Sequence, residues 1–395
     1  MRGVQFDMAD PAFPASLVEL PEPDLPDASW ARVAVGTGGI CGSDLHLFAH
    51  NSGPSPTLMG MAGAFPFVLG HEIGGRVIEA GADCPIAVGA RVVLNPCIAC
   101  AARGLDPCVN CAKGWTSSCL RLDSRVVTGG RSLGYTQGLG GGWAEQVLAH
   151  ASMIHALPDA IPDRAASLYE PVSIACHGVM RAAPVDGEPA LVVGAGIIGL
   201  AALAALKGLY PNNPVTVLAR HEHQAAAARA CGADHVVPTD ASGAHFEELA
   251  RLSGARVVGR KADLMLMGGF PYVVEAVGAP SSINESLRAA AHRGTVLMLG
   301  ATGVTEVDLT PVWYKEIALV GSIDHTVDLG GAPGLAGAPH RHSVDRATDI
   351  LAAGLLPDAA VVTHEFGLDE YREAIETAID RGNSRAIKVV FRPSG

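Results

Sequence analysis

The pattern of apolar and polar positions differs between three parts of the chain. The first part is rich in short apolar runs. Residues 1 to about 170 hold valine-containing runs such as 31–35, 75–80 and 90–95, which Gly and Pro residues separate. Runs of this length, bounded by turn residues, are typical of strands. This part of the chain is therefore predicted to be a β-rich domain.

From about residue 171 to 322 the pattern becomes a strand followed by a helix, repeated. The predicted strands cover 189–196, 214–220, 235–237, 272–278, 295–300 and 317–322. Strands that alternate with helices indicate an α/β domain with a doubly wound parallel sheet. The stretch 251–271 fits the alternation poorly and is interpreted as an insertion.

The last part of the chain mixes both kinds of element. It is predicted to contain a Gly-rich loop at 329–337, a helix near 343–353, a strand around 360–366, a helix over 368–382 and a final strand at 386–391.

Composition and charge exclude several classes of protein. The 395 residues are 49% hydrophobic and 17% charged, which excludes a disordered chain. A formal net charge of −12 disfavours nucleic acid as a partner. The uncharged stretch 190–206 is shorter than the roughly 20 residues of a membrane span. We expect neither a membrane helix nor a secretory signal, and we expect the protein to be cytoplasmic. Its nine cysteines are then expected to serve metal binding or redox chemistry rather than disulfides.

A glycine pattern follows the first strand of the alternating region. Gly194, Gly196 and Gly199 stand directly after an apolar strand and open an Ala/Leu-rich helix. In this context such glycines permit a tight turn and the close approach of a pyrophosphate to the helix N-terminus. The sequence therefore predicts a dinucleotide site.

The end of the second strand of this region predicts which dinucleotide binds. The strand ends at Ala219-Arg220, without the carboxylate that usually binds the adenosine ribose. Because an arginine suits a 2′-phosphate, we expect NADP to be preferred over NAD. The alternative is that Arg220 is solvated and that Glu222 binds the ribose.

Two groups of residues have the chemistry of zinc ligands. Five cysteines lie within 23 positions, and two C-x-x-C pairs among them suit tetrahedral thiolate coordination: Cys97, Cys100, Cys108, Cys111 and Cys119. Four ligands close a structural site, so one cysteine is spare. A sparser set comprises the segments 41–46, 70–72 and 169–171, whose cysteine, histidine and carboxylate side chains are the residue types of an open zinc site, although their spacing alone carries little information.

The order of these motifs along the chain is informative. It runs CGSDLH (41–46), GHEIGGRV (70–77), the five-cysteine loop, GGWAEQV (141–147), YEPVSIACHG (169–178) and GAGIIG (194–199). The chain resembles, over nearly its whole length, the zinc-containing medium-chain dehydrogenase/reductases, the superfamily of alcohol, sorbitol and threonine dehydrogenases. The resemblance implies a GroES-like catalytic domain at 1–170, completed by 323–395, and a Rossmann domain at 171–322. It also implies a homo-oligomer, either a dimer or a tetramer.

The resemblance further implies roles for individual residues. Cys41, His71 and Glu170 match the three ligands of the catalytic zinc, and Glu72 matches a residue that exchanges onto the metal. Asp44 matches a carboxylate that orients the zinc histidine. Two more residues match a proton relay to solvent: Ser43 and His46.

For the structural zinc, Cys108, Cys111 and Cys119 fit the last three ligand positions of the family. Leu105 stands where the first ligand belongs, so either Cys100 or Cys97 takes its place, and we favour Cys100. The expected cofactor site comprises Gly194, Gly196, Ile197, Ile198, Gly199, Ala219, Arg220, Val277 and Leu299. Further candidates for the substrate pocket are His46, Phe48, Trp313 and His325.

These assignments predict an enzyme with two zinc ions per chain. We expect it to transfer a hydride between a secondary alcohol and NAD(P), the alcohol being of the polyol, sugar, cyclitol or amino-alcohol type. Two alternatives are a zinc-dependent carbonyl reductase or dismutase and, from another class, a non-catalytic NAD(P)H-binding zinc protein. The second alternative would be expected to lack a zinc ligand or a relay residue, whereas every matched position is chemically competent.

Overall fold

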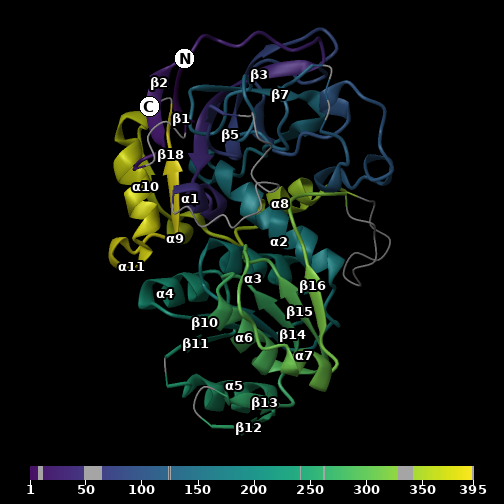
Figure 1. Cartoon of the computed structure of the whole chain (residues 1–395), viewed down its shortest axis with the longest axis vertical. Coiled ribbons are helices and arrows are strands. Elements are labelled where there is room, and N and C mark those ends of the chain that lie inside the picture. The colour runs from purple at the N-terminus through teal and green to yellow at the C-terminus, as the bar shows by residue number, and fades with distance from the viewer. Residues whose placement is uncertain are drawn as a thin grey trace. The chain divides into compact units, whose positions relative to one another are not determined.

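The computed structural model describes residues 1–7, 12–48, 65–122, 124, 126–240, 242–260, 263–327 and 341–393. The chain forms two compact units (Figure 1), which are described separately. Unit 1 comprises Met1–Glu170, Asp324–Val327 and Val362–Gly395, and unit 2 comprises Pro171–Ile323 and Asp328–Val361.

Unit 1 is built mainly from antiparallel strands, in keeping with its short valine-containing runs. Its large sheet has the order β17-β18-β3-β5-β6-β8, with β7 also paired to β3, and a smaller sheet has the order β2-β1-β4. The strands are β1 (Arg2–Phe6), β2 (Ala15–Glu19), β3 (Trp30–Gly39), β4 (Phe67–Val68), β5 (Glu72–Ala80), β6 (Arg91–Leu94), β7 (Gln146–His150), β8 (Ile154–Ala156), β17 (Val362–Phe366) and β18 (Lys388–Phe391). The α-helices are α1 (Gly42–Phe48), α10 (Tyr371–Ile379) and α11 (Arg381–Ser384), and α2 (Tyr169–Arg181) begins here and continues into unit 2.

Buried packing in unit 1 fixes the ends of the strands that carry the candidate site. Trp143 is fully buried, and its indole N–H donates to the carbonyl of Gly39 at 3.0 Å. Gly39 ends β3 and pairs with Glu72 at the start of β5. The segment that leads into α1 is therefore held beside the first residue of β5.

Unit 2 contains the expected doubly wound sheet. Six strands lie in the order β11-β10-β9-β14-β15-β16, and all neighbours are parallel. The strands are β9 (Ala190–Val193), β10 (Val215–Ala219), β11 (His235–Pro238), β14 (Phe270–Glu275), β15 (Ala290–Met298) and β16 (Ala318–Gly321). The helices are α3 (Ile197–Leu209), α4 (Glu222–Ala230), α5 (His245–Ser253), α6 (Pro280–Ala289), α7 (Thr310–Tyr314), α8 (Ser343–Ala352) and α9 (Asp358–Val361). The α/β fold predicted from the alternation is confirmed.

Part of the C-terminal region lies in a different unit from the one expected. Helix α8 belongs to unit 2 because it packs closely on α3, where a Cβ on Gly208 would come within 2.9 Å of Ile350. From the C-terminal region, unit 1 takes only Asp324–Val327 and Val362–Gly395. The Gly-rich loop at 329–337 lies outside the described residues.

The stretch 251–271 holds an addition to the alternating pattern. After α5 ends, β12 (Arg256–Val258) and β13 (Met265–Met267) pair antiparallel as a separate two-stranded sheet. Figure 1 shows them beside α5 at one end of unit 2.

The apolar stretch 190–206 is divided between two elements. Its first four residues form β9, and its last ten lie in α3. Among the described residues, no helix has the length and apolar character needed to cross a membrane.

Candidate functional site

The first candidate ligands converge at the junction of β3, α1 and β5. The Cys41 thiol, a ring nitrogen of His71 and a carboxylate oxygen of Glu72 all lie within 4.8 Å of one another. Ligand atoms placed 2.0–2.3 Å from a tetrahedral zinc ion lie about 3.3–3.8 Å apart, so this group fits zinc. His71 and Glu72 are buried, and Cys41 is half-buried.

A buried network surrounds this group on the side of α1. Asp44 is fully buried; its Oδ2 accepts the backbone N–H of Cys41 at 2.9 Å, and its Oδ1 lies 3.4 Å from Nδ1 of His71. The pKa of His71 is affected first by burial, which lowers it, but Asp44 and Cys41 outweigh burial and raise it well above its ordinary value. Asp44 is therefore placed to orient His71, as the resemblance implies.

Tyr135 completes the network, and sequence reasoning missed it. Its hydroxyl donates to Oδ1 of Asp44 at 2.6 Å and lies 3.1 Å from Oγ of Ser43. Burial, reinforced by Asp44, raises the pKa of Tyr135 well above its ordinary value, so the phenol stays protonated. Because Asp44 engages the phenolic proton, Ser43 donates to Tyr135 and keeps its own lone pairs available. His46 is half-buried on α1, and its side chain makes no hydrogen bond or ion pair with another described residue.

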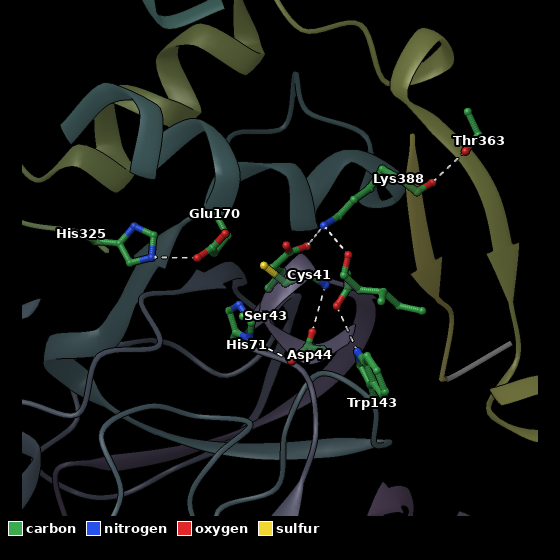
Figure 2. Close-up of polar contacts among 12 residues, drawn as sticks. Cys41, Ser43, Asp44, His71, Trp143, Glu170, His325, Thr363 and Lys388 are labelled. Atoms are coloured by element: carbon green, nitrogen blue, oxygen red, sulfur yellow. Dashed lines mark hydrogen bonds and ion pairs between the residues drawn. The ribbon is translucent and has the colours of Figure 1, made fainter. Parts of the chain in front are cut away.

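Glu170 lies near this group but is not part of it. Its Oε1 is 3.3 Å from Nε2 of His325, and Figure 2 shows the two side chains pointing toward each other. Both residues are buried, and Oε2 of Glu170 makes no hydrogen bond with any described residue. Burial raises the pKa of Glu170, but His325 outweighs burial and holds it below its ordinary value.

Glu72 has a cationic partner that the sequence did not indicate. The ammonium group of Lys388, which is buried at the start of β18, forms an ion pair with Oε2 of Glu72 and donates to the carbonyl of Ile40 at 2.9 Å (Figure 2). Burial raises the pKa of Glu72, and Lys388 offsets only part of that effect. A lysine in a strand that the sequence places 316 residues downstream of Glu72 gives no local signal of this contact.

In the cysteine-rich loop, four of the five thiols converge. Cys100, Cys108, Cys111 and Cys119 have sulfur atoms within 4.8 Å of one another, and Cys97 is not in the group. The sulfur atoms of Cys100 and Cys119 are 3.6 Å apart, close to the roughly 3.8 Å of a tetrahedral zinc–thiolate site.

Backbone amides also point at these sulfur atoms. The N–H of Leu120 donates to Sγ of Cys108 at 3.5 Å, and the N–H of Cys108 donates to Sγ of Cys100 at 3.3 Å. Backbone donors, that of Leu120 first, lower the pKa of the Cys108 thiol to about 6. A thiolate forms readily here, so this donor set fits zinc.

In unit 2 the glycine pattern forms the turn between β9 and α3. Gly194 has φ +101°, and a Cβ on Gly199 would come within 1.8 Å of the Gly194 carbonyl oxygen. A Cβ on Gly196 would meet nothing within 4 Å, so this glycine faces open space at the helix N-terminus. Packing explains two of the glycines, and the third leaves room for a pyrophosphate.

Two other expected cofactor residues, Val277 and Leu299, follow the carboxyl ends of β14 and β15. Val277 is half-exposed, and its side chain lies where a Cβ on Gly194 would collide with it. Leu299 follows β15, and its N–H donates to the carbonyl of Glu275 at 2.9 Å. Ile197 and Ile198 are half-buried in the first turn of α3.

Glu275 was not predicted, and it ends the strand earlier than expected. Its Oε1 accepts the N–H groups of Val277 and Gly278 at 3.0 and 2.9 Å, and the hydroxyl of Ser282 at 2.6 Å. This carboxylate turns the chain after residue 275, whereas the apolar pattern extended the strand to 278.

Arg220 stands at the tip of β10. Ala219 is buried, Arg220 is exposed, and within the described residues Arg220 makes no ion pair. Glu222, the alternative ribose ligand, forms an ion pair with Arg229 at 2.8 Å. Trp313, a candidate for the substrate pocket, is 70% exposed on α7.

The fold and these donor sets define a class of protein: a metal-dependent dehydrogenase with a dinucleotide-binding domain. Comparison with known families agrees with this class. Residues 27–159 match the family described as Alcohol dehydrogenase GroES-like domain, and residues 198–326 match that described as Zinc-binding dehydrogenase.

Individual proteins show the same relationship. An uncharacterized zinc-type alcohol dehydrogenase-like protein of Haemophilus influenzae is 31% identical over 308 residues, which cover 77% of this chain and 78% of that protein. D-arabitol-phosphate dehydrogenase of Enterococcus avium is 26% identical over 382 residues, 96% of this chain and 94% of the relative. The crystal structure of 2R,3R-butanediol dehydrogenase from Bacillus subtilis shares the fold, with a TM-score of 0.76 at 21% identity, over 100% of this chain and 99% of that one.

The chain belongs to the zinc-containing alcohol dehydrogenase family of the medium-chain dehydrogenase/reductase superfamily. It is an oxidoreductase, and zinc and a nicotinamide dinucleotide are the cofactors of its family.

Proposed function

We propose that the protein oxidises the secondary alcohol group of a polyol, sugar, cyclitol or amino alcohol, with NADP as the preferred hydride acceptor. The observation that carries the proposal is the convergence of Cys41, His71 and Glu72, with Glu170 close by. All four residues belong to unit 1, which also contains the match to the GroES-like domain. The names of two relatives, the arabitol-phosphate dehydrogenase and an (R,R)-butanediol dehydrogenase of Saccharomyces cerevisiae, support a substrate with a secondary hydroxyl beside other polar groups.

The proposal gives each residue of the site a role. Cys41, His71 and Glu170 hold the catalytic zinc, with Glu72 as an exchange ligand, and zinc supplies the Lewis acidity that lowers the pKa of the alcohol. Ser43 accepts the hydroxyl proton on a lone pair that its contact with Tyr135 leaves available, and in the same step releases its own hydroxyl proton, so that the serine stays neutral. His46 passes this proton on toward solvent.

A second zinc ion is structural in this proposal. The four converging thiols, those of Cys100, Cys108, Cys111 and Cys119, support it. Such a site needs reduced cysteines, and this supports a cytoplasmic location.

The cofactor assignment rests on unit 2. The open space at Gly196 admits the pyrophosphate, and Arg220 is available for a 2′-phosphate because within the described residues it makes no ion pair. The ion pair between Glu222 and Arg229 disfavours the alternative in which Glu222 binds the ribose.

We also propose a homo-oligomer formed through the edge of the parallel sheet. Within the described residues β16 pairs on one side only. Exposed apolar residues lie on β16 or close to it along the chain, namely Leu309, Trp313, Tyr314, Leu319 and Ile323. An unpaired edge flanked by exposed apolar groups favours pairing with an identical edge. Sedimentation analysis tests this: a monomer at micromolar concentration would contradict it.

The test of function is a screen of secondary alcohols and the matching ketones with both cofactors, monitored by absorbance of the reduced nicotinamide. We expect turnover with at least one polyol-type alcohol, and loss of that turnover in His71→Ala with the fold retained. Activity that survives in His71→Ala would contradict the proposed site. Turnover only from ketone to alcohol would favour the carbonyl reductase.

A further inference from the structure

The four-residue segment Asp324–Val327 contributes a buried histidine to unit 1. The imidazole of His325 is fully buried and stands 3.3 Å from Oε1 of Glu170, which is 2% exposed. The ring also lies against that of Tyr169, with centroids 6.5 Å apart. The histidine is therefore packed in a fixed position beside the candidate zinc ligand.

The two carboxylate oxygens of Glu170 have different surroundings. Oε1 faces the imidazole, whereas Oε2 is buried and has no hydrogen-bond partner among the described residues (Figure 2). A buried carboxylate oxygen without a partner is costly, because it has lost water and gained nothing in return. The site thus holds one oxygen in place and leaves the other for a ligand.

The backbone around His325 is held by the cysteine-rich loop. The hydroxyl of Thr326 donates to the carbonyl of Gly114 at 2.8 Å, and the N–H of Val327 points at the same oxygen at 3.4 Å. The N–H of His325 donates to the thiol of Cys97, the cysteine that is not in the four-thiol group. Gly114 directly follows the short helix Cys111–Lys113, so the segment is attached next to a candidate ligand of the structural zinc.

The backbone conformation at the start of this segment indicates that neighbouring residues hold the segment in place. Asp324 has φ +54°, a left-handed conformation that non-glycine residues adopt infrequently. Such a residue persists where its surroundings determine the geometry. Here the residue directly precedes the histidine that faces Glu170.

We propose that His325 is a positioning residue that donates through Nε2 to Oε1 of Glu170 and so presents Oε2 to the catalytic zinc, and that the cysteine-rich loop anchors His325 through Thr326 and Cys97. This inference rests on the proposed function, since it concerns the same zinc site. It also gives the structural zinc a second effect, because a loop ordered by that metal holds the segment that orients Glu170. Partners of metal ligands of this kind contribute about 10- to 100-fold in metal affinity or activity.

The test compares three variants with the unmodified holoenzyme. His325→Leu keeps the volume but removes the donor, and His325→Gln returns an N–H near the position of Nε2. His245→Leu is the matched control, because His245 is also buried and paired with a glutamate, Glu285, in unit 2. The first readout is the zinc that each protein retains over a graded series of chelator concentrations. The second is the visible spectrum after the more weakly held zinc is exchanged for cobalt.

We expect His325→Leu to lose one zinc at chelator concentrations about 10- to 100-fold lower than the unmodified protein, and to have an altered cobalt spectrum. His325→Gln should recover most of the affinity, and His245→Leu should match the unmodified protein in both readouts. Should His325→Leu fail to fold, Thr326→Val tests the same anchor from outside the site, with a smaller loss in the same direction.

Cys41→Ser separates the two ways in which the inference can fail. If Cys41→Ser releases one zinc while His325→Leu and Thr326→Val retain both with an unchanged cobalt spectrum, the role of His325 is refuted and the proposed function stands. If Cys41→Ser itself retains both zinc ions with an unchanged cobalt spectrum, the zinc site is wrong and both proposals fall.

Discussion

The choice between Cys97 and Cys100 as a structural ligand is open to a direct test by two matched variants. Cys100→Ser replaces a thiol that lies 3.6 Å from that of Cys119, inside the four-thiol group. Cys97→Ser replaces a buried thiol three positions earlier that is outside the group. We expect Cys100→Ser to hold one zinc per chain and Cys97→Ser to hold two.

The expected cost follows from how little else orders the loop. Between Gly104 and Leu122 the only buried residue is Ser117, so apolar burial does not hold this segment. Structural zinc contributes about 10–16 kcal/mol in small domains. Because Cys100→Ser is expected to lose this ion altogether, the cost should exceed about 4 kcal/mol, which lowers the midpoint of thermal unfolding by at least roughly 8–16 °C in a domain of 150–250 residues. A serine at Cys97 can still accept the N–H of His325, so it should cost about 1 kcal/mol, or roughly 2–4 °C.

Elemental analysis after gel filtration gives the zinc stoichiometry, and circular dichroism gives the midpoint of unfolding. Both measurements use the full chain with its metals bound. One zinc in Cys97→Ser together with two in Cys100→Ser would refute the reasoning, because the spare thiol would then be the ligand.

Three further predictions test other parts of the protein. Ser43→Ala should lower kcat by about 10²- to 10⁴-fold and His46→Ala by about 10- to 100-fold, and equal effects in steady-state kinetics would contradict the relay. The unmodified protein should have the higher kcat/KM with NADP, and Ala219→Asp with Arg220→Leu should reverse the preference, each by about 10- to 150-fold; a higher value with NAD would refute the assignment. Burial lowers the pKa of Lys315 to about 8, so the folded state binds fewer protons than the unfolded state between pH 8 and 10.5 and stability should rise there, by about 3 kcal/mol in all. Urea denaturation of Lys315→Met should show no such rise.

How far the fold could be predicted depended on whether the determining contacts were local. The period of apolar residues and the glycines after β9 are local signals, and they predicted the parallel sheet and the turn at Gly194. The end of β14 was missed because a side chain decides it: Glu275 accepts two backbone N–H groups and turns a chain that still reads as apolar. Helix α8 was expected in the other unit because its apolar face does not say which surface it covers.

The candidate site shows the same division. Cys41, His71 and the cysteine loop stand in short motifs whose residue types indicate metal binding. Tyr135 and Lys388 stand in no motif, and they reach the site only through pairing between distant segments. For His325 the sequence offered a residue near the substrate pocket, but its contact with Glu170 depends on a segment held by the cysteine-rich loop. Residues that act through another residue leave no spacing pattern in a single sequence.

The partners of the two glutamates give a physical reason for assigning them different roles. Buried charges are costly unless they are paired, and of the two buried carboxylates only that of Glu72 pairs with an ammonium group among the described residues, that of Lys388. That ammonium neutralises Glu72, which makes its oxygens weaker donors although they already lie beside Cys41 and His71. Glu170 forms no ion pair with a lysine or arginine among the described residues; its Oε1 lies beside His325, and its Oε2 has no hydrogen-bond partner there. These differences support the proposal that Glu170 is the resident zinc ligand and Glu72 the one that exchanges.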